Sequence, residues 1–312
     1  MRPAIQTFAL EKSYSVGFWH KSTKYGLRPL TLTVEEGEIF GYLGPNGAGK
    51  TTTLKLLMGL LFPTGGSAKI LGMDIGDPRM KAQIGFQPEQ PYFYDYLTAP
   101  ELLHYYAKIS GIPAGDRKRS VESVLQRVGL TDVDKLHLRK FSKGMLQRVG
   151  LAQAIIHDPK VVFLDEPMSG LDPIGRREVR DLIQTLKDEG KTVFFSTHIL
   201  SDAEACCDRV AVLNKGELRG VGVVADLTSK LVGQFEVIWE GTDAGRALAD
   251  LGCECRWNGE IGRVMVSESR LNRTLEELLR NEVRLISVNP VRSTVEDYFV
   301  ERLSAEPEKV NA

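Results

Sequence analysis

A glycine-rich segment carries the clearest chemistry in the sequence. It reads glycine, any four residues, glycine, lysine, threonine, so that backbone N–H groups can converge on phosphate oxygens. Lys50 would reach the β- and γ-phosphates of ATP, the Thr51 hydroxyl would bind Mg²⁺, and Thr52 would donate to a neighbouring phosphate oxygen. The segment therefore predicts a phosphate loop for ATP with Mg²⁺. Its residues are Gly44, Pro45, Asn46, Gly47, Ala48, Gly49, Lys50, Thr51 and Thr52.

Two carboxylates follow a short apolar run and have the residue types that hydrolysis requires. Residues 161–164 read Val-Val-Phe-Leu, which is typical of a buried parallel strand, and Asp165 and Glu166 come directly after them. Asp165 would hold the Mg²⁺ shell, and Glu166 would orient or deprotonate the attacking water. Such a pair alone is often a helix cap or a surface pair. The phosphate loop upstream favours a hydrolytic role.

Strands that alternate with helices must position these residues. The phosphate loop lies between an apolar run at 39–43 and a helix-forming stretch at 52–61. Further strands are predicted at 161–164, 192–196 and 209–213, and further helices at 175–189 and 199–207. This order predicts an α/β domain, a P-loop NTPase core with a mainly parallel sheet.

A helical stretch interrupts the alternation. Residues 99–156 contain helical patterns at 101–110, 117–128 and 145–156 and no convincing strand. We therefore expect a helical subdomain inserted into the α/β core. A new series of predicted strands and helices begins after Gly222. We therefore expect the first domain to comprise residues 1–228.

The C-terminal part predicts a small α+β module at 229–303, followed by a loose, charged tail at 304–312. Asn258-Gly259 is a strong hairpin signal. The order of elements matches a split βαβ, ferredoxin-like module, with a further helix at the end. The predicted strands are 235–240, 253–257, 262–267 and 283–288, and the predicted helices are 243–251, 271–281 and 294–303.

Composition narrows the class of protein. A chain of 312 residues suggests about two domains, and 40 Lys plus Arg against 41 Asp plus Glu leave a net charge of -1, which gives no overall field for nucleic acid. Basic pairs such as Arg176-Arg177 are expected to be solvated helix faces. The four cysteines form two close pairs without zinc-site spacing, and no stretch approaches the ~18 apolar residues of a membrane span. We expect a cytoplasmic chain unless a partner tethers it.

Three further motifs extend the pattern. Residues 141–145, Phe-Ser-Lys-Gly-Met, resemble the signature motif of ATP-binding-cassette (ABC) ATPases. Residues 169–172, Ser-Gly-Leu-Asp, resemble the D-loop of that family, and residues 196–198, Ser-Thr-His, resemble its switch-histidine loop. With the phosphate loop, the resemblance covers about residues 5–222. The C-terminal module is similar to the appendage of many cassette subunits that serve ABC-2-type exporters.

The resemblance implies how the ATP sites form. Two cassettes would pair head to tail, so that Ser142 and Gly144 act on ATP bound to the other subunit. Their hydroxyl and N–H groups at a helix N-terminus suit a γ-phosphate. His198 would contact the γ-phosphate, and Asp172 would link the two sites at the dimer interface. Both halves of a site are present in this chain, which favours a homodimer over a heterodimer.

The resemblance also implies partners. A cassette without a membrane span requires separate integral-membrane permease subunits, which would hold it at the cytoplasmic face of the cell membrane. A groove near residues 89–103 would receive the permease's coupling helix, export is favoured over import, and no nucleic acid is expected. The alternative is a soluble ABC-type ATPase that acts on nucleic acid or ribosomes. Such relatives usually carry two cassettes, coiled coils or zinc modules, and this sequence shows none.

Departures from the family leave alternatives open. Glu89 stands at the Q-loop position where the family has glutamine; it could bind Mg²⁺ or position water, and Gln87 and Gln90 compete for the role. Tyr14 is our choice for the aromatic residue that stacks on adenine.

An apparent insertion at residues 15–26 offers Trp19 and Tyr25 as rivals to that choice. We expect the insertion to be a surface loop.

Overall fold

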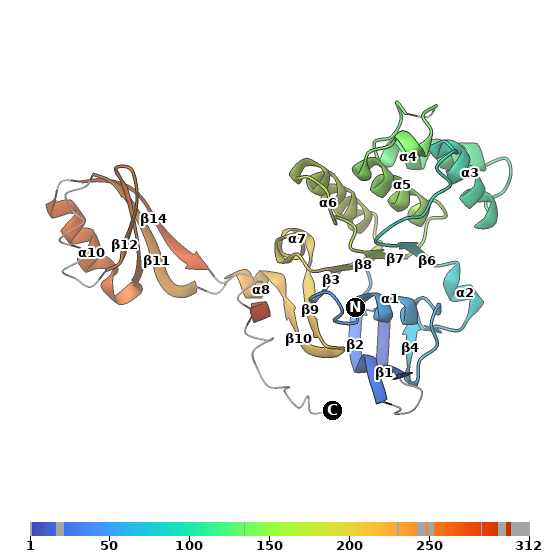
Figure 1. The fold of residues 1–312 in the computed structure, drawn as a ribbon, viewed down its shortest axis with the longest axis horizontal. Helices are drawn as coiled ribbons and strands as arrows, with labels where there is room; N and C mark the ends of the chain where they lie inside the picture. The colour runs from blue at the N-terminus through green and yellow to red at the C-terminus, as the bar shows by residue number, and fades with distance from the viewer. Residues whose placement is uncertain are drawn as a thin grey trace. The chain divides into compact units, whose positions relative to one another are not determined.

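The computed structural model divides the chain into two compact units (Figure 1). The first comprises Met1–Val224 with Phe299–Ala312, and the second comprises Ala225–Tyr298. The division falls slightly before the predicted boundary at residue 228, because the main sheet of the first unit ends with a strand at Val223. The described residues are 2–16, 22–133, 135–229, 231–241, 248, 253–281, 283–292 and 298–300.

A six-stranded sheet forms the centre of the first unit, in the order β10-β9-β3-β8-β7-β6. All its neighbouring pairs are parallel except β9 with β10, which confirms the predicted α/β class. Every residue of β3, β7 and β8 is buried, as expected for apolar strands covered on both faces. The strands are β3 Ile39–Leu43, β6 Ile84–Gln87, β7 Val161–Asp165, β8 Thr192–Thr197, β9 Arg209–Asn214 and β10 Glu217–Val223.

The sequence did not predict a second, antiparallel sheet in this unit, ordered β2-β1-β4-β5. Residues 15–26, expected to be a surface loop, are instead strand wherever they are described: Tyr14 pairs with Lys24, and Val16 pairs with Ser22. Trp19 lies outside the described residues. Register shifts interrupt the β1–β2 pairing and break the strict alternation that identifies a strand. The strands are β1 Pro3–Val16, β2 Ser22–Glu35, β4 Gly65–Ile70 and β5 Met73–Asp74.

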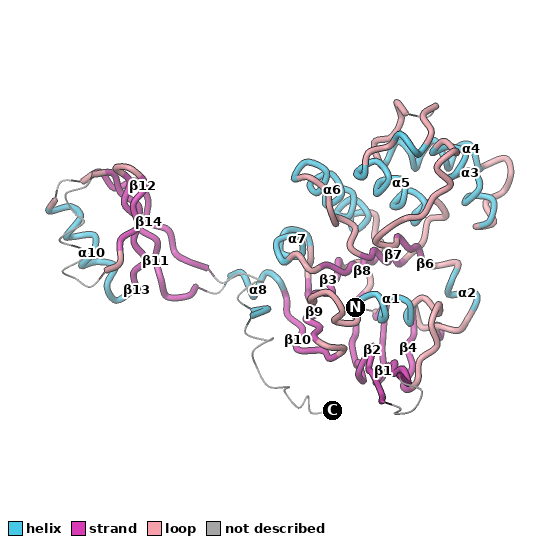
Figure 2. Tube along the Cα trace, in the orientation of Figure 1, coloured by secondary structure: helices cyan, strands magenta, loops and turns pink. Residues whose placement is uncertain are grey.

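Helices cover the central sheet and form the predicted helical subdomain (Figure 2). Thr98 caps α3 in a reciprocal pair with Glu101, which fixes where the subdomain begins. α6 is amphipathic, since Val179, Ile183 and Leu186 are buried at helical spacing. In the first unit the helices are α1 Lys50–Leu57, α2 Pro78–Lys81, α3 Ala99–Ile109, α4 Arg117–Arg127, α5 Lys143–Ile155, α6 Pro173–Asp188 and α7 Leu200–Cys206.

The second unit contains an antiparallel sheet in the order β12-β13-β11-β14, the strand order of a split βαβ module. Trp239 is fully buried in its core, and Gly262 lies against the indole with no room for a side chain. The predicted helices at 243–251 and 294–303 and the tail at 304–312 lie largely outside the described residues. The elements are α8 Val224–Ser229, β11 Leu231–Glu240, β12 Cys255–Asn258, β13 Ile261–Ser267, α10 Glu268–Arg280 and β14 Arg284–Arg292.

Candidate functional site

The phosphate loop joins the C-terminal end of β3 to the start of α1, and close main-chain packing fixes its shape. A Cβ atom at Gly44 would lie 2.5 Å from the Leu213 carbonyl oxygen, and one at Gly49 would collide with the Gly26 carbonyl oxygen. Gly49 also has a φ of 108°, which side-chain-bearing residues rarely adopt. The loop therefore requires glycine at both positions. It borders a cavity of about 650 Å³, and residues 45–52 all line this cavity.

Lys50 lies at the inner wall of the cavity with its ammonium group held in place. Its Nζ donates to the Gly44 carbonyl oxygen at 2.7 Å and forms an ion pair with Glu166 Oε1 at 3.1 Å. Both side chains are buried. A buried cation beside the phosphate loop suits a polyphosphate, because each phosphate oxygen needs positive charge or a donor when water is removed.

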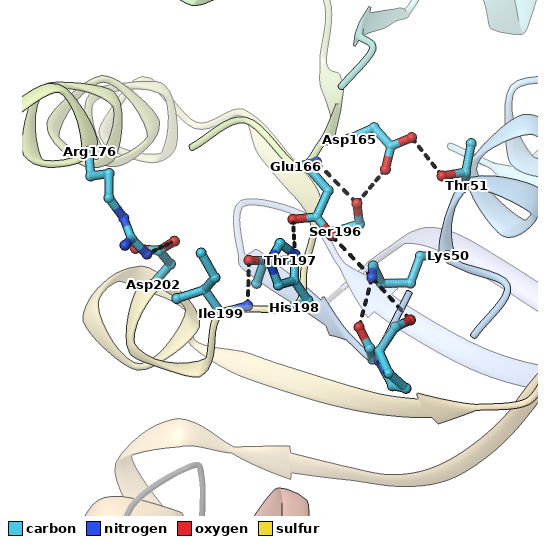
Figure 3. A network of polar contacts seen from close by, with 12 residues as sticks. Lys50, Thr51, Asp165, Glu166, Arg176, Ser196, Thr197, His198, Ile199 and Asp202 are labelled. Carbon is cyan, nitrogen blue, oxygen red and sulfur yellow. Dashed lines mark hydrogen bonds and ion pairs between the residues drawn. The ribbon is translucent and has the colours of Figure 1, made fainter. Parts of the chain in front are cut away.

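Asp165 lies at the end of β7 and faces the loop (Figure 3). Its Oδ2 accepts from the Thr51 hydroxyl at 2.9 Å, and its Oδ1 accepts from the Ser196 hydroxyl at 2.5 Å. Oxygen ligands from one carboxylate and one hydroxyl fit Mg²⁺, which usually takes few protein ligands and completes its shell with water and substrate phosphate. Among the described residues, no group of three or more His, Cys, Asp or Glu is arranged to hold a metal without such help.

Glu166 follows Asp165 in a left-handed backbone conformation, with φ 50°. Its backbone N–H donates to the Ser196 carbonyl oxygen at 3.1 Å, which holds this turn against β8. The Glu166 carboxylate then contacts Lys50 through Oε1 and His198 through Oε2, at 3.1 Å and 2.8 Å (Figure 3). A strained residue held in this way presents its carboxylate to the cavity, as a water-activating base requires.

His198 follows β8 and is exposed, with 40% of its side chain accessible. Its Nδ1 faces Glu166 Oε2, and a carboxylate can only accept, so Nδ1 carries the proton. Nε2, the other ring nitrogen, takes no part in this contact. His198 is not among the described residues that line the cavity, but it contacts Glu166, which does.

The signature and D-loop residues do not join this network within one chain. Ser142 caps α5, its Oγ accepting from the Met145 N–H at 3.2 Å, and Asp172 caps α6 in the same manner. In the described part of the chain, neither these residues nor Gly144 line the nucleotide cavity. The structure brings Lys50, Thr51, Asp165, Glu166 and His198 together, whereas Ser142, Gly144 and Asp172 stand apart.

The structure separates the candidates at the Q-loop. Glu89 lines the nucleotide cavity. Gln87 is buried and donates from Nε2 to the Gln147 carbonyl oxygen on α5 at 3.2 Å, so its amide faces the helical subdomain. Gln90 is exposed and does not line the cavity. Of the three, only Glu89 is placed to meet a ligand there.

Two aromatic residues border the cavity on the β1–β2 hairpin. Tyr14 and Tyr25 both line it, and they are exposed to nearly the same extent, 40% and 41%. Lys12 lies over the Tyr14 ring at 5.4 Å, and Arg28 lies over the Tyr25 ring at 4.8 Å. Either ring can present a face to a base.

Sequence reasoning missed one ion pair next to the site. Arg176 was expected on a solvated helix face together with Arg177, but this is wrong for Arg176. Its guanidinium contacts both carboxylate oxygens of Asp202, at 2.6 Å and 3.2 Å, and Asp202 is only 1% exposed. Arg177 is exposed as expected. No sequence signal links residues on two different helices, so only the fold reveals this pair.

Comparison with known proteins identifies the family. The family model for ABC transporters matches residues 27–169. An uncharacterized ABC transporter ATP-binding protein of Synechocystis sp. is 45% identical over 305 residues, covering 96% of this chain and 84% of the relative. The bacitracin transport ATP-binding protein BcrA of Bacillus licheniformis is 42% identical over 221 residues, covering 70% of this chain and 69% of BcrA.

A solved structure of an ATP-binding cassette is also similar to this chain. The chain matches a dimeric, post-hydrolysis state of the ATP-binding cassette MJ0796 bound to ADP and Pi with a TM-score of 0.65 and 25% identity. The match covers 70% of this chain and 98% of the cassette. The chain therefore belongs to the ATP-binding proteins of ABC transporters, and it is an ATPase of that family.

Proposed function

We propose that the chain hydrolyses ATP as one half of a head-to-tail dimer and thereby drives a separate membrane permease. One observation carries this proposal: the nucleotide cavity contains the phosphate loop and Glu166, but Ser142 and Gly144 do not line it. Ser142 is instead exposed at the start of α5. A second copy facing this chain supplies the missing donors. Because the chain carries both halves of a site, a homodimer is sufficient.

The residues that line the cavity and those in contact with them divide the chemistry of hydrolysis. Lys50 and the loop N–H groups hold the β- and γ-phosphates, and Glu166 accepts a proton from the attacking water. His198 donates to the γ-phosphate through Nε2 while Nδ1 donates to Glu166, which requires a proton on both ring nitrogens. Mg²⁺, held by Thr51, Asp165 and Glu89, would neutralise phosphate charge.

The base of ATP stacks on the β1–β2 hairpin, with Tyr14 as the proposed platform. Tyr14 lies beside Gly26, where an added Cβ would come within 2.7 Å of its ring, so the Tyr14 ring packs on the main chain close to the phosphate loop. Tyr25 is the competing platform on the neighbouring strand.

A second cavity, of about 810 Å³, supports docking of the permease. It lies between the Q-loop and the helical subdomain, and four of its aromatic side chains, those of Tyr92, Tyr94, Tyr96 and Tyr105, are unusually exposed. Tyr92 is fully exposed. Aromatic rings with hydroxyl groups suit a protein segment that is apolar with some polar edges. The aromatic lining consists of Tyr92, Phe93, Tyr94, Tyr96, Tyr105, Tyr106 and Phe141.

The permease would hold the chain at the cytoplasmic face of the cell membrane. Among the described helices, none is long and apolar enough to cross a bilayer, so attachment through a partner is the simplest route. BcrA is named for bacitracin transport, and together with the resemblance to ABC-2-type exporter subunits this favours export.

The decisive experiment isolates the tagged chain from its native membranes in mild detergent. Glu166→Gln with ATP should hold the closed dimer, and a multi-span protein should copurify with it. Tyr92→Ala/Tyr94→Ala should lose that protein while keeping the dimer. Recovery of ribosomes or nucleic acid in place of a membrane protein would contradict the proposal.

Mixed dimers test the head-to-tail arrangement. Ser142→Arg should obstruct the γ-phosphate site of the other subunit, whereas Lys50→Ala disables the site of its own subunit. A dimer that carries Ser142→Arg on one chain and Lys50→Ala on the other should retain one intact site. Loss of both sites in that dimer would show that Ser142 acts within its own chain.

A further inference from the structure

We infer that Arg176 and Asp202 act as positioning residues for hydrolysis, by fixing the start of α7 to the start of α6. Neither residue touches the nucleotide cavity in the described part of the chain. Their effect on catalysis must therefore act through other residues. The inference rests on the roles proposed above for His198, Glu166 and Asp172.

On one side, Asp202 lies in the first turn of α7, only four residues after His198. Its backbone N–H donates to the Ile199 carbonyl oxygen at 3.2 Å, and the Ile199 N–H donates to the Thr197 hydroxyl at 3.0 Å. A short chain of hydrogen bonds therefore joins the Asp202 backbone to the end of β8, and Figure 3 shows its Ile199–Thr197 link. The position of the Asp202 carboxylate consequently constrains the position of the His198 ring.

On the other side, Arg176 lies in the first turn of α6, directly after the D-loop. Its backbone N–H donates to the Asp172 carbonyl oxygen at 3.0 Å. Asp172 also accepts from the Gly175 N–H at 2.7 Å through its side chain. Arg176 and Asp172 thus belong to one hydrogen-bonded turn, so that a shift of either moves the other.

The ion pair that joins the two turns is the kind that fixes orientation as well as distance. Arg176 Nε and Nη2 each contact a different oxygen of Asp202, at 3.2 Å and 2.6 Å. Two parallel contacts from a planar guanidinium prevent rotation, which a single contact from lysine does not. Because Asp202 is 1% exposed, its carboxylate relies on the guanidinium, not on bulk water, for its charge partner.

The geometry connects the two functional loops through this pair. The switch-histidine loop, which faces the γ-phosphate of its own subunit, and the D-loop, which faces the partner in the proposed dimer, cannot move separately while the pair is intact. Hydrolysis in one site thereby affects the geometry presented to the other site.

The test is Arg176→Lys, which keeps the charge and removes the two-point contact. We expect kcat for ATP to fall by about tenfold or more, because small misplacements of catalytic groups are costly. KM for ATP should stay within about twofold, because the phosphate-loop contacts are unchanged. Arg177→Lys, at the exposed neighbouring position, is the matched control and should leave both constants unchanged.

A second variant excludes simple misfolding. Arg176→Gln/Asp202→Asn replaces the ion pair with two neutral amides that can still hydrogen-bond, so the buried carboxylate is not left unpaired. We expect this variant to fold, to bind ATP with normal affinity and to show the same loss of kcat.

Two outcomes would overturn the inference. One is Arg176→Lys that melts at a lower temperature but retains kcat, since the pair would then be structural. The other is an equal kcat loss in Arg177→Lys. Failure of the underlying roles is distinguishable, because His198→Ala in the wild-type background would then retain full turnover.

Discussion

The two sheets that were predicted from sequence differ in where they place polar residues. In the parallel sheet of the first unit, β7 and β8 are buried along their whole length, and polar groups gather at the C-terminal ends, as with Asp165 and Ser196. In the antiparallel sheet of the second unit, β13 alternates buried and exposed residues from end to end. Polar residues gathered at the C-terminal ends of parallel strands suit a catalytic site, whereas polar residues spread over one face of a sheet form a solvated surface.

The largest expected effect comes from Asp165, the carboxylate at the C-terminal end of β7. Asp165→Asn should lower ATP turnover on the order of 10²-fold, because the amide cannot balance Mg²⁺ charge beside Thr51. Steady-state hydrolysis measures this loss. Glu236→Gln, a carboxylate change in the β11 strand of the second unit, should leave turnover unchanged. Equal losses in both variants would mean that a carboxylate at the strand end of the first unit and one in the sheet of the second unit matter equally for turnover.

The next effect concerns the independence of the two cores. Trp239→Ala should destabilise the second unit by about 3–5 kcal/mol, since this fully buried ring is among the largest side chains of its core. Hydrogen exchange should rise in β11 and β13 while the strands of the first unit stay protected. Loss of protection in β7 and β8 as well would show that the two units unfold together.

A smaller effect tests the alternation in β13 itself. Val264→Ala should cost about 2 kcal/mol because Val264 is buried. Met265→Ala, at the next position and 49% exposed, should change stability by no more than about 0.5 kcal/mol. Denaturant unfolding of the second unit compares the two variants. A larger loss from Met265→Ala would mean that the outer face is covered.

The smallest effect is a difference in thiol reactivity in the first unit. Burial raises the pKa of Cys207 well above the usual thiol range, whereas Cys206 is only partly buried. Only the thiolate reacts, so Cys207 should be alkylated more slowly than Cys206, and its rate should rise only at a pH above the usual thiol range. Mass spectrometry after timed iodoacetamide treatment checks this. Fast labelling of Cys207 at neutral pH would contradict its burial.

Sequence patterns predicted the elements that are apolar along their whole length and the motifs that lie next to them. β3, β7, β8 and β9 follow the predicted ranges closely, because a buried parallel strand is a run of apolar residues. Lys50, Asp165 and His198 lie close together because each lies at the end of one of these strands or just after it or its loop, and their roles in hydrolysis stay predictions.

The antiparallel sheet and the Arg176–Asp202 pair were not predictable in this way. The β1–β2 pairing contains irregular register, and its apolar residues, such as Leu27 and Leu30, do not alternate evenly. Arg176 resembles Arg177 in every local respect, and only the packing of α6 beside α7 distinguishes them. Local sequence carries no information about which distant residue a side chain meets.

The contact between Gly49 and Gly26 has a consequence for which size of nucleotide fits the cavity. Two main-chain segments lie against each other there, one in the phosphate loop and one in β2 of the hairpin that carries Tyr14. Main-chain atoms have no alternative rotamers, so the distance between the phosphate loop and the hairpin that carries Tyr14 is fixed by the backbone. Side-chain changes in the cavity can alter how strongly a nucleotide is held, but a different length of nucleotide requires a new backbone path.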